Sequence, residues 1–230
     1  MDVLTIGNLI IDNLEGGYYH PDMYTANPEF FSPTESIGAA YARSGETMFG
    51  FDRVNGGSLN QKPKMVEFWA IIDANYTPHH GDLKWWNEMA GYFRNGKPSG
   101  IPLDVQKSLR RLASEQMAEQ LNYYADLYLD PAAKQVVFKD PRLLLQFLYA
   151  CWNGPGNFKK FAEVVNKAYG EGTRNALALY NLVQQKRLQI LPANAAAVDA
   201  LAQSLQTSKN SLLWWGLAIA GGLLAYKILK

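Results

Sequence analysis

Apolar residues recur every three to four positions along most of this chain, the spacing at which they line one face of an α-helix. The first such stretch is followed by Gly16 and Gly17, which readily adopt the left-handed conformation that ends a helix. Glycine, proline and asparagine separate the later stretches from one another. We therefore expect helices over residues 4–14, 63–74, 82–93, 103–129, 141–153, 158–169 and 173–188.

The stretch KDPRLLLQFLYACWNGPGN predicts a central helix. Asp140 is a favourable N-cap, Pro141 suits the first helical position, and Gly154 with Pro155 ends the run. Between these signals the residues are apolar nearly all round, which is typical of a helix buried on every side. Cys151 lies in this run, so we expect its thiol to be buried and unreactive.

Residues 18–57 contain turn formers, aromatic residues and glycines rather than a helical pattern. They predict a long irregular or short-stranded segment, and such segments inside a compact domain are usually functional. Together the patterns predict a mainly α fold with some α+β character. Residues 1–190 would form one helical domain that carries a small lobe rich in loops and hairpins.

The C-terminal end of the chain has a different character. Residues 211–229, SLLWWGLAIAGGLLAYKIL, carry one charge, and a helix that spans a membrane needs about 20 apolar residues. Tryptophans at one edge, and tyrosine with lysine at the other, match the side chains that favour membrane interfaces. We predict a single transmembrane helix over 211–229, with a buried core helix as the alternative. We predict that residues 191–210 form a linker, and the sequence leaves open whether this linker is helical.

The composition narrows the functional classes. A formal net charge of +1 argues against nucleic acid as a partner. No G-x-S-x-G box, phosphate loop or dinucleotide fingerprint occurs, so serine hydrolases and nucleotide-dependent enzymes gain little support. The adjacent His79 and His80 would point in different directions, and the remaining histidine is His20, so the sequence predicts no metal site. We expect no cofactor.

Glu15 is the first candidate for catalysis. It lies where the first predicted helix ends, and the partial negative charge of a helix C-terminus favours the neutral form of a carboxyl group. A carboxyl group that stays protonated near neutral pH is the general acid of glycoside cleavage, which also needs a second carboxylate or a held water. The segment RSGETMFGFDRVNGG offers Glu46, Thr47 and Asp52 for this second role.

The boxes NLEGGYYHPD and SGETMFGFD resemble those of phage-type lysozymes of the glycoside hydrolase 108 group. That family carries an E-G-G-Y box and, downstream, a G-G-x-T-x-x-G-I box. The later stretch LLQFLYACWNGPGNFKKF is similar to the second half of the family, where a buried central helix ends in an aromatic-N-x-G turn. The resemblance covers roughly residues 1–190. It implies a lysozyme-like fold that cuts the glycan strand of bacterial peptidoglycan.

The resemblance also implies roles for single residues. Glu15 falls on the general acid of the family, and Thr47 falls on a threonine that helps to position the attacking water. Asn153 falls at the end of the central helix, where it would line the sugar groove. The candidate substrate-binding residues are accordingly Gly16, Gly17, Tyr18 and Asn153.

The second carboxylate is where the chain departs from the family. The members often place an aspartate a few residues before the threonine, and this chain has Ala42 there. Glu46 is the candidate substitute, with Asp22 and Asp52 behind it. A reaction that uses Glu15 alone is the alternative.

Each candidate also has a purely structural interpretation. Glu46 could hold the hairpin together through Arg43 or Arg53. Thr47 could be a hydroxyl at a strand edge, and Asn153 could cap the turn before the following glycine.

The resulting expectation is a membrane-anchored glycosidase of the muramidase type. The N-terminus shows no secretory signal, so we expect a lysin carried in a phage virion, which cuts the host cell wall during infection. Its expected partners are peptidoglycan, a lipid membrane through residues 211–229, and other virion proteins. Three alternatives stay open: a lytic transglycosylase, a non-catalytic glycan-binding virion protein on a degenerate lysozyme fold, and a protein that perturbs membranes through its C-terminal helix.

Overall fold

The computed structural model describes residues 2–15, 18, 46–79, 101–192 and 194–207. Within these ranges 79% of the residues are helical and the strands form one short hairpin, which confirms the prediction of a mainly α protein. The hairpin consists of β1 (Thr47–Met48) and β2 (Phe51–Asp52), and 3-10 turns occur at η2 (Gly57–Gln61) and η3 (Thr77–His79). The α-helices are α1 (Val3–Asn13), α4 (Pro63–Asn75), α6 (Leu103–Tyr128), α7 (Pro131–Lys139), α8 (Pro141–Trp152), α9 (Pro155–Gly170), α10 (Ala176–Ile190) and α11 (Ala195–Thr207).

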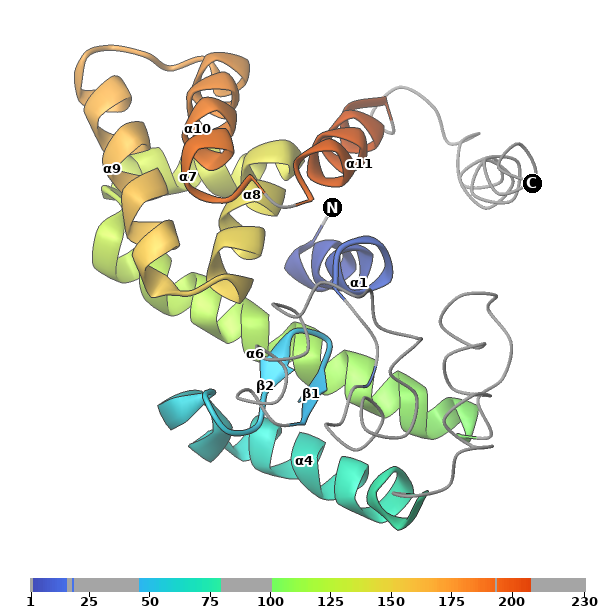
Figure 1. Ribbon diagram of the computed structural model, residues 1–230. Coiled ribbons are helices and arrows are strands. Elements are labelled where there is room, and N and C mark those ends of the chain that lie inside the picture. The colour runs from blue at the N-terminus through green and yellow to red at the C-terminus, as the bar shows by residue number, and fades with distance from the viewer. Residues whose placement is uncertain (1, 16–17, 19–45, 80–100, 193, 208–230) are drawn as a thin grey trace.

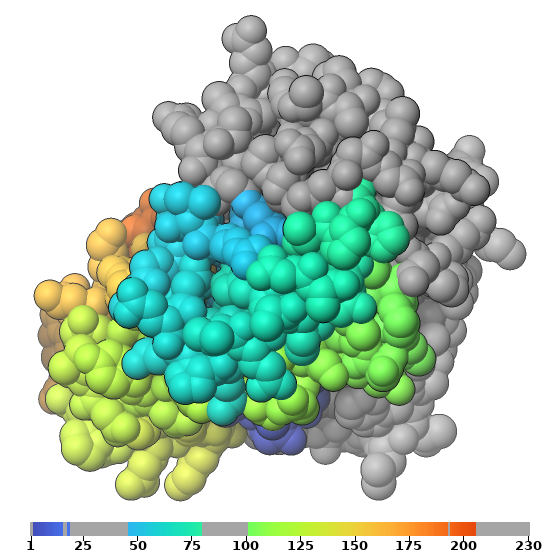
Figure 2. All heavy atoms as spheres, turned by 90° about the horizontal axis from the view of Figure 1, so that it is seen from below, coloured from blue at the N-terminus to red at the C-terminus, as the bar shows by residue number. Residues whose placement is uncertain are grey.

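The helices are arranged in two groups around α6, the longest of them (Figure 1). The hairpin and α4 lie on one side of α6, and residues 46–79 form a continuous surface beside it in Figure 2. At the other end of α6, helices α7, α9, α10 and α11 all contact α8, which is the centre of the second group. Helix α1 contacts both α6 and α8, so it lies between the two groups.

Helix α8 has the start, the end and the burial that its sequence predicts. Asp140 accepts hydrogen bonds from the backbone N–H groups of Arg142 and Leu143, and Pro141 occupies the first helical position. All residues from Leu143 to Cys151 are buried. Gly154 follows with a φ of 99°, a conformation that side chains rarely allow.

One helix lies outside every predicted element, and another forms in the linker whose helicity the sequence leaves open. α7 fills residues 131–139, where we predicted no element. α11 lies within the predicted linker, residues 191–210, and it contacts α8 through buried side chains at helical spacing. These side chains are Val198, Leu201, Ala202 and Leu205. Because their burial stabilises α11 against the core, the packed domain extends beyond residue 190.

The starts of two predicted helices differ from the structure. α9 begins at Pro155 rather than at residue 158, since proline at the first position needs no N–H partner. α10 begins at Ala176 rather than at residue 173, because the side chain of Asn175 caps it by accepting from the N–H of Ala178.

The helix predicted over 82–93 and the transmembrane helix predicted over 211–229 both lie outside the described residues. Among the helices that the structure does describe, none combines the length and the apolar character needed to cross a membrane.

Candidate active site

Glu15 lies just beyond α1, where three parts of the chain meet. Helix α1 ends at Asn13, and the backbone N–H of Glu15 still donates to the carbonyl of Ile10 at 3.1 Å. The Glu15 side chain reaches the turn of the hairpin and the end of α8. A Cβ atom placed on Gly50 would lie 2.3 Å from Oε2 of Glu15 and 2.9 Å from Cδ1 of Trp152. The carboxyl group therefore packs against the backbone of the hairpin turn.

The conformation of this turn brings Gly50 to the carboxyl group. Met48 pairs with Phe51, so Phe49 and Gly50 form a two-residue loop. Both have a positive φ, 52° at Phe49 and 75° at Gly50, as a type I′ turn requires. The indole Nε1 of Trp152 donates to the carbonyl of Phe49 at 2.6 Å, which fixes the turn to α8.

The surroundings of Glu15 favour its protonated form. The side chain is partly buried, and burial raises the pKa of Glu15 to about 7 from an ordinary value of 4.5. Among the described residues, the carboxylate has no hydrogen-bond donor or cation that would stabilise its charge. The partial negative charge at the end of α1 acts in the same direction as burial. Glu15 therefore keeps its proton much closer to neutral pH than an ordinary glutamate does.

Two further side chains near Glu15 were not singled out from the sequence. Tyr149 of α8 is buried, and burial is the main reason why the pKa of its hydroxyl is raised; the charge of Glu15 adds to this shift. Asn194, which has a φ of 56°, donates from Nδ2 to the carbonyl of Leu14 at 3.4 Å. The residue just before α11 is thereby linked to the residue just before Glu15.

Glu46 occupies an environment of the opposite kind. It is 6% exposed, and both of its carboxylate oxygens are engaged: one accepts from the hydroxyl of Tyr18, and the other pairs with Arg53 at 2.5 Å. Arg53 in turn forms a two-pronged ion pair with Asp73 of α4, with both contacts at 2.6 Å. Of the two arginines considered as partners of Glu46, Arg53 is thus found in this role, and Arg43 lies outside the described residues.

The structure places Thr47 and Asn153 on the two elements that contact Glu15. Thr47 is partly buried in β1, on the strand that leads into the turn. Asn153 is exposed at the end of α8, where its backbone N–H and its Nδ2 both donate to the carbonyl of Tyr149, the Nδ2 at 2.9 Å. Asn153 therefore has the capping role that was its structural interpretation.

Of the three residues expected to bind substrate beside the acid, the structure describes Tyr18. Its side chain is 4% exposed, its ring centroid lies 4.6 Å from that of Tyr76, and its hydroxyl donates to Glu46. Tyr18 thus supports Glu46 and offers no open ring face to a sugar. Gly16 and Gly17 lie outside the described residues.

Besides Tyr149 and Asn194, the sequence analysis did not assign Gly50 and Trp152 to the site. Gly50 is the glycine of the T-x-x-G part of the second family box. Trp152 is the aromatic residue of the aromatic-N-x-G turn. The motifs were the available signal, but they do not reveal that Glu15 and Trp152 both pack against Gly50.

The described part of the site offers a proton donor. In the described ranges, no three His, Cys, Asp or Glu side chains are grouped so that they could hold a metal ion. What the arrangement can do is deliver a proton from Glu15 to a group that approaches the hairpin turn. Comparisons of the chain with known protein families, curated proteins and solved structures each gave no match. Function is therefore inferred from the site and the sequence motifs.

Proposed function

We propose that this protein cleaves the glycan strand of bacterial peptidoglycan, as a glycosidase of the muramidase type with Glu15 as its general acid. The observation that carries the proposal is the environment of Glu15, whose carboxyl group packs against a hairpin turn and has a pKa raised to about 7. Such a group holds a proton at neutral pH and can transfer it to a glycosidic oxygen. The resemblance of the motifs to those of phage-type lysozymes supplies the substrate class.

In the hydrolytic reaction, Glu15 donates its proton to the oxygen of the scissile bond. The bond between this oxygen and C1 of the sugar breaks, positive charge develops on the sugar ring, and a water attacks C1 while a base takes its proton. We assign the positioning of this water to Thr47, on the strand that leads into the turn at Gly50. Glu46 is the proposed second carboxylate, whose negative charge would stabilise the positive charge that develops on the sugar.

The contacts of Glu46 favour lytic transglycosylation as a second form of the reaction. Because Tyr18 and Arg53 engage both oxygens of Glu46, this carboxylate would have to leave a partner before it could take a proton from water. In transglycosylation Glu15 is sufficient. Its carboxylate, formed by the first proton transfer, accepts the proton of the sugar's own 6-hydroxyl as that oxygen bonds to C1, which gives an anhydro sugar.

The proposal extends to the fold and to the location of the protein. An acid at the end of the first helix, a hairpin packed against it and a buried central helix support a lysozyme-like fold. The apolar sequence of residues 211–229 supports a membrane anchor. With the phage-type motifs, it supports a lysin held in a virion membrane, where tethering confines cleavage to the wall beside the particle.

The test uses the full-length protein in a non-ionic detergent with purified peptidoglycan, and mass spectrometry of the soluble products. Glu15→Gln removes the acid and keeps the shape of the side chain. Glu171→Gln is the matched control, because Glu171 also ends a helix and also precedes a glycine, but at an exposed position.

We expect wild type and Glu171→Gln to release fragments at equal rates, and Glu15→Gln to be at least about 100-fold slower. Reducing-end fragments would establish hydrolysis, and anhydro fragments, lighter by one water, would establish transglycosylation. Glycan binding without cleavage in all three proteins would refute the enzyme and leave a glycan-binding structural protein.

A further inference from the structure

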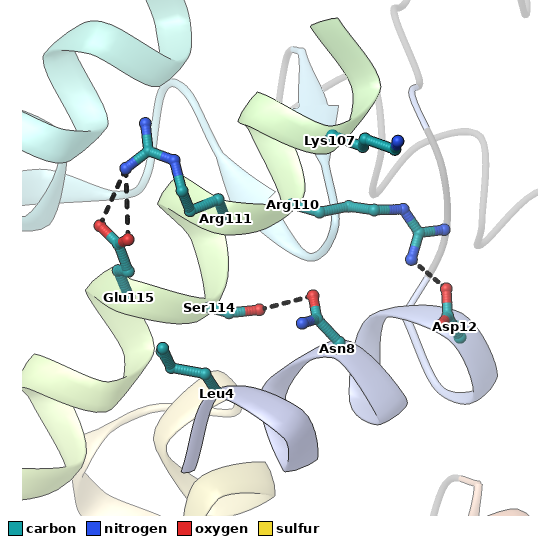
Figure 3. A pocket seen from close by; sticks show the side chains of 8 residues that line it. All are labelled: Leu4, Asn8, Asp12, Lys107, Arg110, Arg111, Ser114 and Glu115. Atoms are coloured by element: carbon teal, nitrogen blue, oxygen red, sulfur yellow. Dashed lines mark hydrogen bonds and ion pairs between the residues drawn. The ribbon is translucent and has the colours of Figure 1, made fainter. Parts of the chain in front are cut away.

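A hollow of about 340 Å³ opens between α1 and α6 (Figure 3). The two helices approach closely at one point, where a Cβ atom on Gly7 would lie 3.1 Å from the side chain of Ser114. The hollow opens beside this contact. Its lining residues are Leu4, Asn8 and Asp12 of α1, and Lys107, Arg110, Arg111, Ser114 and Glu115 of α6.

Positive and negative groups line this hollow side by side. Lys107 and Arg110 stand one turn apart on α6, and Figure 3 shows their side chains extending in the same direction. Arg110 contacts Asp12 through one nitrogen, which leaves further N–H groups of its guanidinium for another acceptor. Lys107 has no carboxylate partner among the described residues. The hollow therefore offers donors for a carboxylate and, in Asp12, an acceptor for an ammonium group.

The hollow is connected to the site of Glu15 in two ways. On α1 its lining residues follow one another at four-residue intervals, and Glu15 comes three residues after Asp12, just past the end of the helix. A second connection runs through the hairpin. The guanidinium carbon of Arg110 lies 5.8 Å from the ring centroid of Phe49, the neighbour of Gly50 in the turn against which Glu15 packs.

We propose that this hollow binds the peptide stem of peptidoglycan, an inference that rests on the proposed function. The stem leaves the sugar next to a scissile glycosidic bond and carries carboxylates together with a free amino group. Its carboxylate would bind between Lys107 and Arg110, and its ammonium group would bind Asp12. A volume near the lower end of small-ligand pockets, about 300–1,000 Å³, suits a short peptide rather than a second glycan strand.

The first test measures binding without cleavage. A stem tripeptide, L-alanyl-γ-D-glutamyl-diaminopimelate, is titrated by calorimetry into the full-length Glu15→Gln protein in detergent. We expect Lys107→Gln in this background to weaken binding about tenfold, since a charge-assisted hydrogen bond is lost. Lys107→Arg should largely retain binding. Lys160→Gln, at an exposed position on α9, is the control and should bind as before. The tripeptide with amidated carboxyl groups should bind about as weakly as Lys107→Gln binds the unmodified one.

The second test compares intact peptidoglycan with glycan strands from which an amidase has removed the stems. We expect wild type and Lys160→Gln to prefer the intact substrate about tenfold in kcat/KM, and Lys107→Gln to lose most of this preference. Equal tripeptide binding with and without Lys107, or no binding at all, would overturn the stem site even if cleavage is normal. Absence of cleavage on both substrates would instead overturn the proposed function, and tripeptide binding would still decide whether the hollow binds stems.

Discussion

Replacing Glu15 by glutamine should stabilise the folded protein at high pH and leave its stability at low pH unchanged. The carboxyl group has an ordinary pKa of 4.5, whereas burial in the folded state raises the pKa of Glu15 to about 7. The folded state therefore binds this proton more tightly than the unfolded chain does. A difference of about 2.5 in pKa corresponds to about 3 kcal/mol, which ionisation of Glu15 subtracts from the free energy of unfolding.

The pH range of the effect follows from the two pKa values. Below pH 4.5 both the folded and the unfolded chain hold the proton, so Glu15 costs nothing. Between pH 4.5 and about 7 the unfolded chain ionises first, and the cost grows with pH. Above about pH 7 both states are ionised and the whole cost of about 3 kcal/mol is present. Glutamine carries no charge and bears no such cost, so its advantage should follow the same curve.

The assay is urea unfolding of the full-length protein in detergent, followed by tryptophan fluorescence at several pH values from about 4 to 9. Subtracting wild type from Glu15→Gln cancels the titration of all other groups that the two proteins share. Glu171→Gln should show a flat difference, since that residue is exposed. A Glu15→Gln difference that is flat, or that grows as the pH falls, would refute the burial of an unpartnered carboxyl group at this site.

Three further predictions concern the neighbours of Glu15 and the core of α8. Gly50→Ala should slow glycan cleavage at least about tenfold and lower the free energy of unfolding by about 2 kcal/mol, because a side chain is disfavoured at a φ of 75° and would collide with Glu15. Urea unfolding and product release measure both effects, and unchanged values would contradict the contact. Trp152→Phe keeps a ring but removes the donor to the carbonyl of Phe49, so it should cost about 1–3 kcal/mol in the same unfolding assay. Cys151 should resist a thiol reagent in the native protein and react in urea, because the thiol is buried and burial raises its pKa. Rapid labelling of the native protein would show that this residue of α8 is accessible to solvent.

The helices that were predicted well are those whose signals are local. α8 is bounded by Asp140, Pro141 and Gly154, and each acts on its immediate neighbours in the chain. α11 lies in residues 191–210, where the sequence predicts a linker and leaves open whether it is helical. Its helix packs through Val198, and the core surface on α8 that receives this side chain is formed by a distant part of the chain. Tertiary packing therefore decides the structure of α11, and the local sequence pattern carries no information about that packing.

In the candidate site, too, local features could be predicted from the sequence, whereas contacts between distant segments could not. Glu15 was identified because a carboxyl group at a helix end beside two glycines is a local feature of the sequence. Glu15 and Trp152 both pack against Gly50, which joins three separate segments, so this arrangement could not be derived from spacing. The sequence left the role of Glu46 open between catalysis and an ion pair. The structure shows that ion pair with Arg53, because β2 returns this arginine to the start of β1.

The fold surrounds the carboxyl groups of Glu15 and Glu46 with different neighbours, and this difference supports different roles for the two residues. Among the described residues, no donor or cation stabilises the charge of Glu15, so it is suited to give a proton and take one back. Glu46 is held between Tyr18 and Arg53, so it is suited to keep a fixed position. Different environments for two acids are typical of acid-catalysed glycoside cleavage. Among the described residues, Glu15 has no donor of the kind that Tyr18 and Arg53 provide to Glu46, and this contrast is what the proposed role of Glu15 as a general acid requires.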